Sequence, residues 1–393
     1  MSLPKGATTG CSSSSGAARI AATRPLETRG GGSASATAAR RSLRVLPLVI
    51  GLAVPGFAHA DLDYDFTPVT QEIASLLAEY PTITGAALIV TRDGGTITQQ
   101  YFGANVPTTM LPIASASKWL SALVIERLVE AGVMSWSDTV GEYIPNAPAD
   151  KLPVTLGQLF SHTAGFPQAD DPCLGDQSNY TLATCAQEIL SIPLTYPPGT
   201  RFSYTGNGMQ VGGWMAEIAT GQSWDQIFQE EVATPLGMTR TDYASGSTAP
   251  PYVTVPNPYI AGGVRSTVVD YGYVVQMVAQ HGYWNGTSFL SPAGIAGMQE
   301  DQTHGVPIIY SPDPDSYGYG YGEWRDIVDA NGNAVQVSST GKFATSPWVD
   351  NDTGVGAVFF TFSQDDQLQP DLDALWANVR AVVTDPVFDG GFD

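Results

Sequence analysis

Strand-like segments lie near both ends of this chain, and helical segments fill its middle. The strand-like segments are residues 83–91, 96–102, 333–338 and 354–362. The first two are joined by Arg-Asp-Gly-Gly at 92–95, which predicts a β-hairpin. Because no polar linker separates the two ends, we predict one antiparallel sheet built from both of them, with a largely helical insertion at roughly 155–300.

Helical periodicity is strongest just after the hairpin. Apolar residues recur at steps of three and four in residues 115–131, and Gly132 follows as a helix stop. Further helices are expected at 183–190, 209–219, 224–233, 268–280, 292–298 and 369–383. We therefore expect a single α/β (more narrowly α+β) domain at 61–385, preceded by a leader at 1–60 and followed by a tail at 386–393.

The leader differs from the rest of the chain in charge. It holds seven of the 17 Lys and Arg residues but one of the 38 acidic residues. Arg40, Arg41 and Arg44 precede the apolar segment 45–57 and an Ala-His-Ala site ending at Ala60, the pattern of a cleaved export signal. The adjacent arginines fit a twin-arginine signal, and an ordinary secretory signal is the alternative. We expect a periplasmic or secreted protein after cleavage near Ala60.

Charge and motif absences exclude several function classes. The formal net charge is −21, which argues against a nucleic-acid partner and against anionic membranes. The sequence contains no run of 18 apolar residues, so no membrane-spanning helix is predicted. The sequence has no H-E-x-x-H, P-loop or G-x-G-x-x-G motif, so we expect neither metal nor cofactor. Gly318, Gly320 and Gly322 alternate with tyrosines, which is a strand-like pattern. The oligomeric state stays open.

Two cysteines follow the leader, Cys173 and Cys185, and both belong to one polar stretch. In an oxidising compartment, such a pair is expected to form a disulfide. Two free thiols in a buried segment are the alternative.

The S-x-x-K pattern at Ser115 and Lys118 is the candidate catalytic motif. Residues three apart on a helix share one face, so the Lys118 amine can reach the Ser115 hydroxyl. A serine needs a base to become nucleophilic, and a lysine serves when burial lowers its pKa. The pattern also occurs at Ser2, inside the leader, and at Ser339, where an extended chain around Gly341 would point the two side chains apart. The alternative at Ser115 is an N-cap serine followed by a solvated lysine.

Five segments in order carry a family resemblance. They read Ile-Ala-Ser-Ala-Ser-Lys at 113–118, Leu-Phe-Ser-His-Thr-Ala-Gly-Phe-Pro at 159–167, Pro-Gly-Thr-Arg-Phe-Ser-Tyr at 198–204, Pro-Leu-Gly-Met-Thr at 235–239 and Gly-Gly-Val-Arg-Ser-Thr at 262–267. Together they resemble the serine β-lactamase/penicillin-binding superfamily. The resemblance is to the branch that contains class C β-lactamases, DD-peptidases and, nearest in character, family VIII carboxylesterases. It implies a β-lactamase-like fold.

The resemblance also implies roles for individual residues. Ser115 would be the nucleophile that forms an acyl-enzyme, Lys118 the general base or proton relay, and Tyr204 the second-motif tyrosine that shares proton transfer. The backbone N–H groups of Ser115 and Lys342 would form the oxyanion hole. His162 would lie in a structural turn, and a Ser–His arrangement is the alternative.

Two departures from the family pattern bear on the substrate. The second motif, Y-x-N, has Gly206 at its third position, and Asn207 one residue further could substitute in substrate binding. The third motif, K-T-G, reads Ser339-Thr340-Gly341, so the lysine that supports a substrate carboxylate is missing. We expect an exported serine hydrolase, a carboxylesterase acting on small or medium esters. The alternatives are a β-lactamase, a D-alanyl-D-alanine peptidase, an amidase of the same fold and a catalytically inactive binding module.

Overall fold

The computed structural model describes residues 64–168, 171–314, 316–365 and 368–385. The expected leader, its cleavage site at Ala60 and the tail at 386–393 lie outside the described residues. The description below therefore concerns the expected hydrolase domain.

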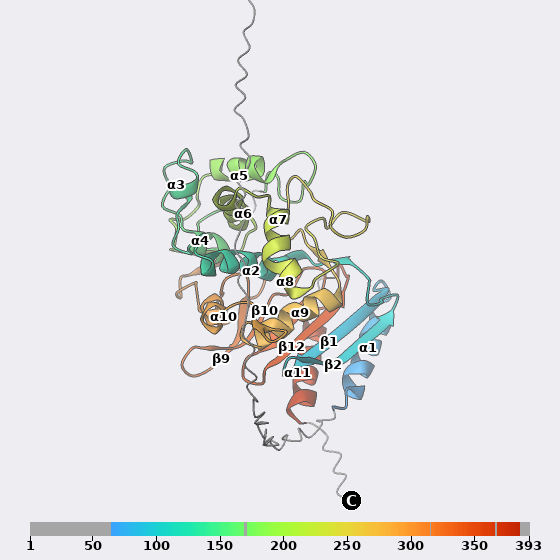
Figure 1. Ribbon diagram of the computed structural model, residues 1–393. Coiled ribbons are helices and arrows are strands. Elements are labelled where there is room, and N and C mark those ends of the chain that lie inside the picture. The colour runs from blue at the N-terminus through green and yellow to red at the C-terminus, as the bar shows by residue number, and fades with distance from the viewer. Residues whose placement is uncertain (1–63, 169–170, 315, 366–367, 386–393) are drawn as a thin grey trace, which may run out of the picture. The chain divides into compact units, whose positions relative to one another are not determined.

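A six-stranded antiparallel sheet joins the two ends of the domain. Its order is β2-β1-β12-β11-β10-β9, and every neighbouring pair is antiparallel. The strands are β1 (Gly85–Arg92), β2 (Gly95–Gly103), β9 (Trp324–Val328), β10 (Ala334–Ser338), β11 (Ser346–Asp350) and β12 (Val355–Thr361). The early strand β1 pairs with the late strand β12 along its length, as Figure 1 shows, so the predicted sheet of both chain ends is confirmed.

The hairpin of β1 and β2 has the turn that its sequence favours. Asp93 and Gly94 both have positive φ, 51° and 75°. Two consecutive positive φ values match the right-handed twist of the flanking strands, and Asp-Gly tolerates them well. The turn pairs Arg92 with Gly95, and a shift of register between Val90 and Thr91 then places Ala86 of β1 opposite Phe102 of β2.

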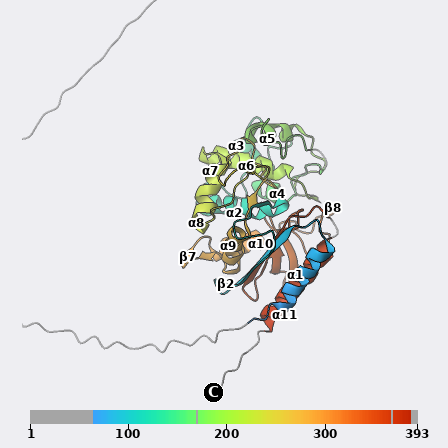
Figure 2. The same cartoon turned by 90° about the vertical axis from the view of Figure 1, so that its right-hand side faces the viewer.

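Both faces of the sheet are covered, which explains why β1 reads as a continuous apolar run. Ala87 and Ile89 belong to the hydrophobic core shared with α9, whereas Ala86, Leu88 and Val90 belong to the core shared with α1 and α11. Successive strand residues point to opposite faces, so alternate residues of β1 enter different cores. Figure 2 shows α1 and α11 side by side along their face of the sheet.

The helices confirm the predicted segments and add others. They are α1 (Thr67–Glu79), α2 (Ser117–Glu130), α3 (Val140–Tyr143), α4 (Leu156–Phe160), α5 (Leu182–Ser191), α6 (Asn207–Thr220), α7 (Trp224–Phe228), α8 (Thr234–Leu236), α9 (Val268–Ala279), α10 (Pro292–Gln299) and α11 (Gln369–Thr384). The predicted helix at 224–233 is α7 continued by a π-helical turn, Gln229–Ala233. Among the described residues, no helix is both long and apolar enough to cross a membrane.

Short strand pairs lie outside the main sheet. They are β3 (Leu111–Pro112) with β5 (Arg265–Ser266), β4 (Phe202–Ser203) with β8 (Ile308–Tyr310), and β6 (Tyr283–Trp284) with β7 (Thr287–Ser288). The parallel pair β4·β8 places the chain after residue 305 beside the chain that leads into α6.

The predicted disulfide between Cys173 and Cys185 is present and buried. It ties the loop before α5 to the helix itself, across 12 residues of sequence. Cross-linking a loop of this size removes conformations from the unfolded chain, a contribution of about 3 kcal/mol to the free energy of unfolding.

Candidate active site

The chain turns sharply just before the candidate nucleophile. Ala114 has φ +45°, a left-handed conformation that alanine rarely adopts, and a short 3₁₀ turn, Ala114–Ala116, precedes α2. The turn is held from outside, because Ile113 N–H donates to the Val264 carbonyl at 3.0 Å and Ser117 Oγ accepts from Val264 N–H at 3.1 Å. Ser115 thus lies on a 3₁₀ turn rather than in the predicted α-helix, and it stays partly exposed.

Lys118 meets Ser115 as the helical spacing predicted. Its Nζ lies 3.0 Å from Ser115 Oγ and 2.8 Å from the Ala261 carbonyl oxygen. Lys118 is 2% exposed, and this burial lowers the pKa of its amine to about 7. A solvated lysine beside an N-cap serine is therefore excluded for this pair. At neutral pH a large fraction of the amine is uncharged and has a lone pair for a proton.

Tyr204 completes the cluster from the segment between β4 and α6. The Lys118 Nζ lies 4.6 Å from the centre of its ring. Burial raises the pKa of the Tyr204 phenol well above its usual value, and the nearby Ser115 side chain acts in the opposite direction. The phenol is thus protonated at neutral pH and lies near the serine. The structure brings the three predicted residues together.

His162 holds the backbone on both sides of Tyr204. Its carbonyl accepts from Ser203 N–H at 3.0 Å, and its Nδ1 accepts from Thr205 N–H at 3.4 Å. The imidazole packs on the Tyr204 ring with centroids 4.4 Å apart. Burial, and secondly the charge of Lys118, hold the pKa of His162 well below its usual range. A neutral imidazole that accepts through Nδ1 carries its proton on Nε2, so His162 has no lone pair left to act as a base.

The Ser339-Thr340-Gly341 segment lies against the nucleophile turn. Ser339 Oγ donates to the Gly322 carbonyl at 3.0 Å and lies 3.5 Å from the Ser115 carbonyl oxygen. A Cβ on Gly341 would collide with the Ile113 carbonyl oxygen, so only glycine fits this approach. The segment is extended as expected, because Ser339 N–H donates to the Pro347 carbonyl at 3.3 Å and Gly341 N–H to the Thr345 carbonyl at 2.8 Å, which continues the pairing of β10 with β11. The chain turns only after Gly341, whose carbonyl accepts from Ala344 N–H at 2.9 Å.

The remaining predicted site residues are Thr340, Lys342 and Asn207. Thr340 Oγ1 lies 3.2 Å from Ser346 Oγ, and the Lys342 side chain is exposed. Within the described ranges, neither Ser115 N–H nor Lys342 N–H donates a hydrogen bond. Asn207 is buried at the start of α6, and its Nδ2 donates to the Pro167 carbonyl at 3.4 Å. Its amide is thereby tied to the loop that ends at Pro167.

A family model described as Beta-lactamase matches residues 73–382, which is most of the chain. The chain belongs to the beta-lactamase family. The match covers the Ser115–Lys118 pair, Tyr204 and the segment 339–342, so all of these lie in the region that the family model matches.

Similar proteins come from two bacteria. Penicillin-binding protein 4 of Amycolatopsis lactamdurans is 32% identical over 180 residues, which are 43% of this chain and 47% of that protein. Protein flp of Staphylococcus aureus (strain COL) is 25% identical over 41% of this chain and 35% of its own length. The matched region is thus less than half the length of either relative.

Solved structures extend the likeness over the whole domain. A β-lactamase-like protein of Bacteroides dorei DSM 17855 is 32% identical with a TM-score of 0.73, covering 82% of this chain and all of that one. A family VIII carboxylesterase is 18% identical with a TM-score of 0.64, covering 81% of this chain and 97% of that one. The second likeness concerns the fold alone. The predicted β-lactamase-like fold is confirmed.

Sequence reasoning missed the aromatic cluster beside the centre in this beta-lactamase family chain. Tyr204 stacks on Trp324 with ring centroids 5.3 Å apart, and Tyr319 packs edge-on against Trp324 at 4.7 Å. The glycines that alternate with tyrosines do not form the expected strand. A Cβ on Gly322 would collide with the Lys118 carbonyl group, and Gly318 has φ +113°. Glycine at alternate positions therefore marks a loop pressed against α2, and this was the available signal.

Proposed function

We propose that this serine β-lactamase superfamily hydrolase cleaves small or medium uncharged carboxylic esters through an acyl-enzyme on Ser115. The observation that carries the proposal is the 3.0 Å contact between Ser115 Oγ and the buried Lys118 amine, whose pKa of about 7 suits a base at neutral pH. Pairing a weak nucleophile with such a base is a general route to acyl transfer.

In the proposed reaction Ser115 supplies the nucleophile, and Lys118 and Tyr204 transfer the proton. Ser115 Oγ attacks the ester carbonyl carbon while its proton passes to the Lys118 amine. The carbonyl oxygen becomes an oxyanion, which the N–H groups of Ser115 and Lys342 stabilise. The C–O bond to the alcohol then breaks, and the alcohol oxygen takes the proton that Lys118 holds, by way of the Tyr204 phenol. Water attacks the acyl-enzyme with the same groups in reverse roles, releasing the acid.

The third motif supports an uncharged substrate. Ser339 stands where penicillin-interacting relatives have a lysine, and its hydroxyl already donates to the Gly322 carbonyl. The Lys342 side chain is exposed, and it takes no part in the contact between Ser115 and Lys118. A substrate carboxylate would therefore lack a cationic partner, and charge-assisted hydrogen bonds are about twice as strong as neutral ones.

Matched esters test this preference. We expect p-nitrophenyl butyrate to be hydrolysed with a kcat/KM about tenfold or more above that of p-nitrophenyl hemisuccinate, which adds a carboxylate to a similar acyl chain. A chromogenic cephalosporin measured beside them should turn over little. Preference for the hemisuccinate, or rapid cephalosporin turnover, would instead favour a β-lactamase or D-alanyl-D-alanine peptidase.

We also propose that the protein works outside the cytoplasm. The buried Cys173–Cys185 disulfide supports this, because such bridges persist in oxidising compartments. The intact mass of the exported protein is expected to correspond to a chain that begins at Asp61. Export without loss of the first 60 residues would contradict the proposed signal.

A further inference from the structure

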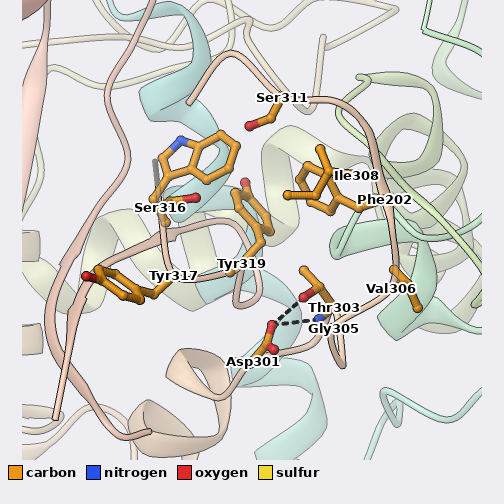
Figure 3. A pocket seen from close by; sticks show the side chains of 12 residues that line it. Phe202, Asp301, Thr303, Gly305, Val306, Ile308, Ser311, Ser316, Tyr317 and Tyr319 are labelled. Carbon is orange, nitrogen blue, oxygen red and sulfur yellow. Dashed lines mark hydrogen bonds between the residues drawn. The ribbon is translucent and has the colours of Figure 1, made fainter. Parts of the chain in front are cut away.

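A cavity of about 300 Å³ lies beside the aromatic cluster, two members of which, Tyr319 and Trp324, line it. Figure 3 shows Phe202, Ile308 and Tyr319 around the same space, with Tyr317 nearby, and Trp324 also lines it. Ile308 is 55% exposed, so it stands at the mouth and not in the core. A volume near 300 Å³ is at the small end for ligand pockets, suited to one aromatic ring or a short alkyl group.

Several polar groups of the cavity are engaged within the protein. Asp301 accepts from the Thr303 N–H at 3.0 Å and from its hydroxyl at 2.6 Å, drawn as dashed lines in Figure 3. The hydroxyls of Ser311 and Ser316 both donate to the Asp313 carbonyl. The walls thus offer apolar surface, and the Asp301 carboxylate disfavours an anion. The chemistry fits an uncharged apolar group.

The cavity adjoins the proposed reaction centre through two of its walls. Trp324 stacks on Tyr204 and lies opposite Ser338 in the β9–β10 pair, one residue before the third motif. On the other wall is Ile308 of β8, and two residues further along this strand the Tyr310 carbonyl accepts from Tyr204 N–H at 3.0 Å. The cavity is therefore linked to Tyr204 and to the third motif by Trp324, and to the Tyr204 backbone by β8.

We infer that this cavity receives the alcohol moiety of the ester, an inference that rests on the proposed function. In that reaction the proton reaches the alcohol oxygen by way of the Tyr204 phenol, so the departing alcohol must lie next to Tyr204. The adjoining apolar cavity then holds the group attached to that oxygen, and an aryl or short alkyl alcohol fills it. The acyl chain stays on the Ser115 side.

Ile308 allows a direct test with a matched control. Ile308→Trp narrows the mouth of the cavity, whereas Ile309→Trp changes the next residue of the same strand, which is also exposed but does not line the cavity. We expect Ile308→Trp to lower kcat/KM for benzyl butyrate about tenfold or more relative to methyl butyrate. The ratio between methyl butyrate and methyl 4-phenylbutyrate, which differ only in the acyl chain, should stay within twofold. Ile309→Trp should leave both ratios as in the unchanged protein.

A binding measurement separates this inference from the proposed function. Calorimetric titration of benzyl alcohol into Ser115→Ala should show binding that Ile308→Trp removes and Ile309→Trp keeps. Such binding together with no hydrolysis of any ester would support the cavity and contradict the proposed reaction. Ser115-dependent ester hydrolysis with an unchanged benzyl-to-methyl ratio in Ile308→Trp, or a change that follows the acyl chain instead, would overturn the inference.

Discussion

Ser115→Ala is expected to lower ester hydrolysis by about 10³-fold or more, because loss of a serine nucleophile removes the covalent route entirely. Ser115 Oγ has the buried Lys118 amine at 3.0 Å and the Tyr204 phenol nearby. Hydrolysis of p-nitrophenyl butyrate measures the loss. Covalent labelling by a fluorophosphonate probe should disappear in the same variant.

Ser75→Ala is the matched control for this substitution. Ser75 lies exposed on α1, and its hydroxyl donates only to the Gln71 carbonyl of its own helix. Its loss should leave turnover and labelling unchanged. Full activity in Ser115→Ala would place the nucleophile elsewhere. Absence of labelling in the unaltered protein would favour a catalytically inactive binding module.

Lys118 is expected to set the pH dependence of the reaction. Burial lowers the pKa of its amine from an ordinary value near 10.5 to about 7. Below pH 7 the amine is mainly protonated and cannot accept the Ser115 proton, and above pH 7 it is mainly neutral. We therefore expect kcat/KM to rise with pH through an apparent pKa of about 7 and then to level off.

Lys118→Arg is the sharpest variant for this prediction. A guanidinium stays protonated at every accessible pH, so kcat/KM should fall by about 10²–10⁴-fold and lose its rise near pH 7. Lys118→Met places no charge in the interior, and kcat/KM should fall by a similar factor. A similar fall in both variants would show that the missing base, and not a destabilised fold, lowers the activity. Lys151→Arg makes the same change at a second buried lysine, which pairs with Asp150 at 2.7 Å, and should keep the profile. A wild-type profile in Lys118→Arg would exclude Lys118 as the base.

Local pattern was sufficient for most of the fold. The hairpin could be predicted because Asp93 and Gly94 favour its turn, and β1 and β12 because apolar runs at both chain ends must share a covered sheet. Helix α1 was missed, although Val69, Ile73 and Leu76 follow a helical period and enter one core. The apolar periodicity of α1 extends over few residues next to the expected leader, and it is weaker than the apolar periodicity of α2.

The sequence predicted the contacts of the candidate site only where both residues belong to the same short segment. Ser115 and Lys118 meet because they are three residues apart at the start of a helix. The left-handed Ala114 was not predictable, because hydrogen bonds to the distant Val264 hold that turn. The aromatic neighbours of Tyr204 were missed for the same reason, since Trp324 reaches it from another strand of the chain.

The acyl-enzyme itself is the most direct test of this account. Protein mixed with p-nitrophenyl butyrate and quenched in acid would be digested, and its peptides analysed by mass spectrometry. We expect a butyryl group, an added mass of about 70 Da by loss of the alcohol, on the peptide that contains Ser115, and none in Ser115→Ala. Turnover with the acyl group on a different residue, or with no acylated peptide under any quench time, would contradict the account.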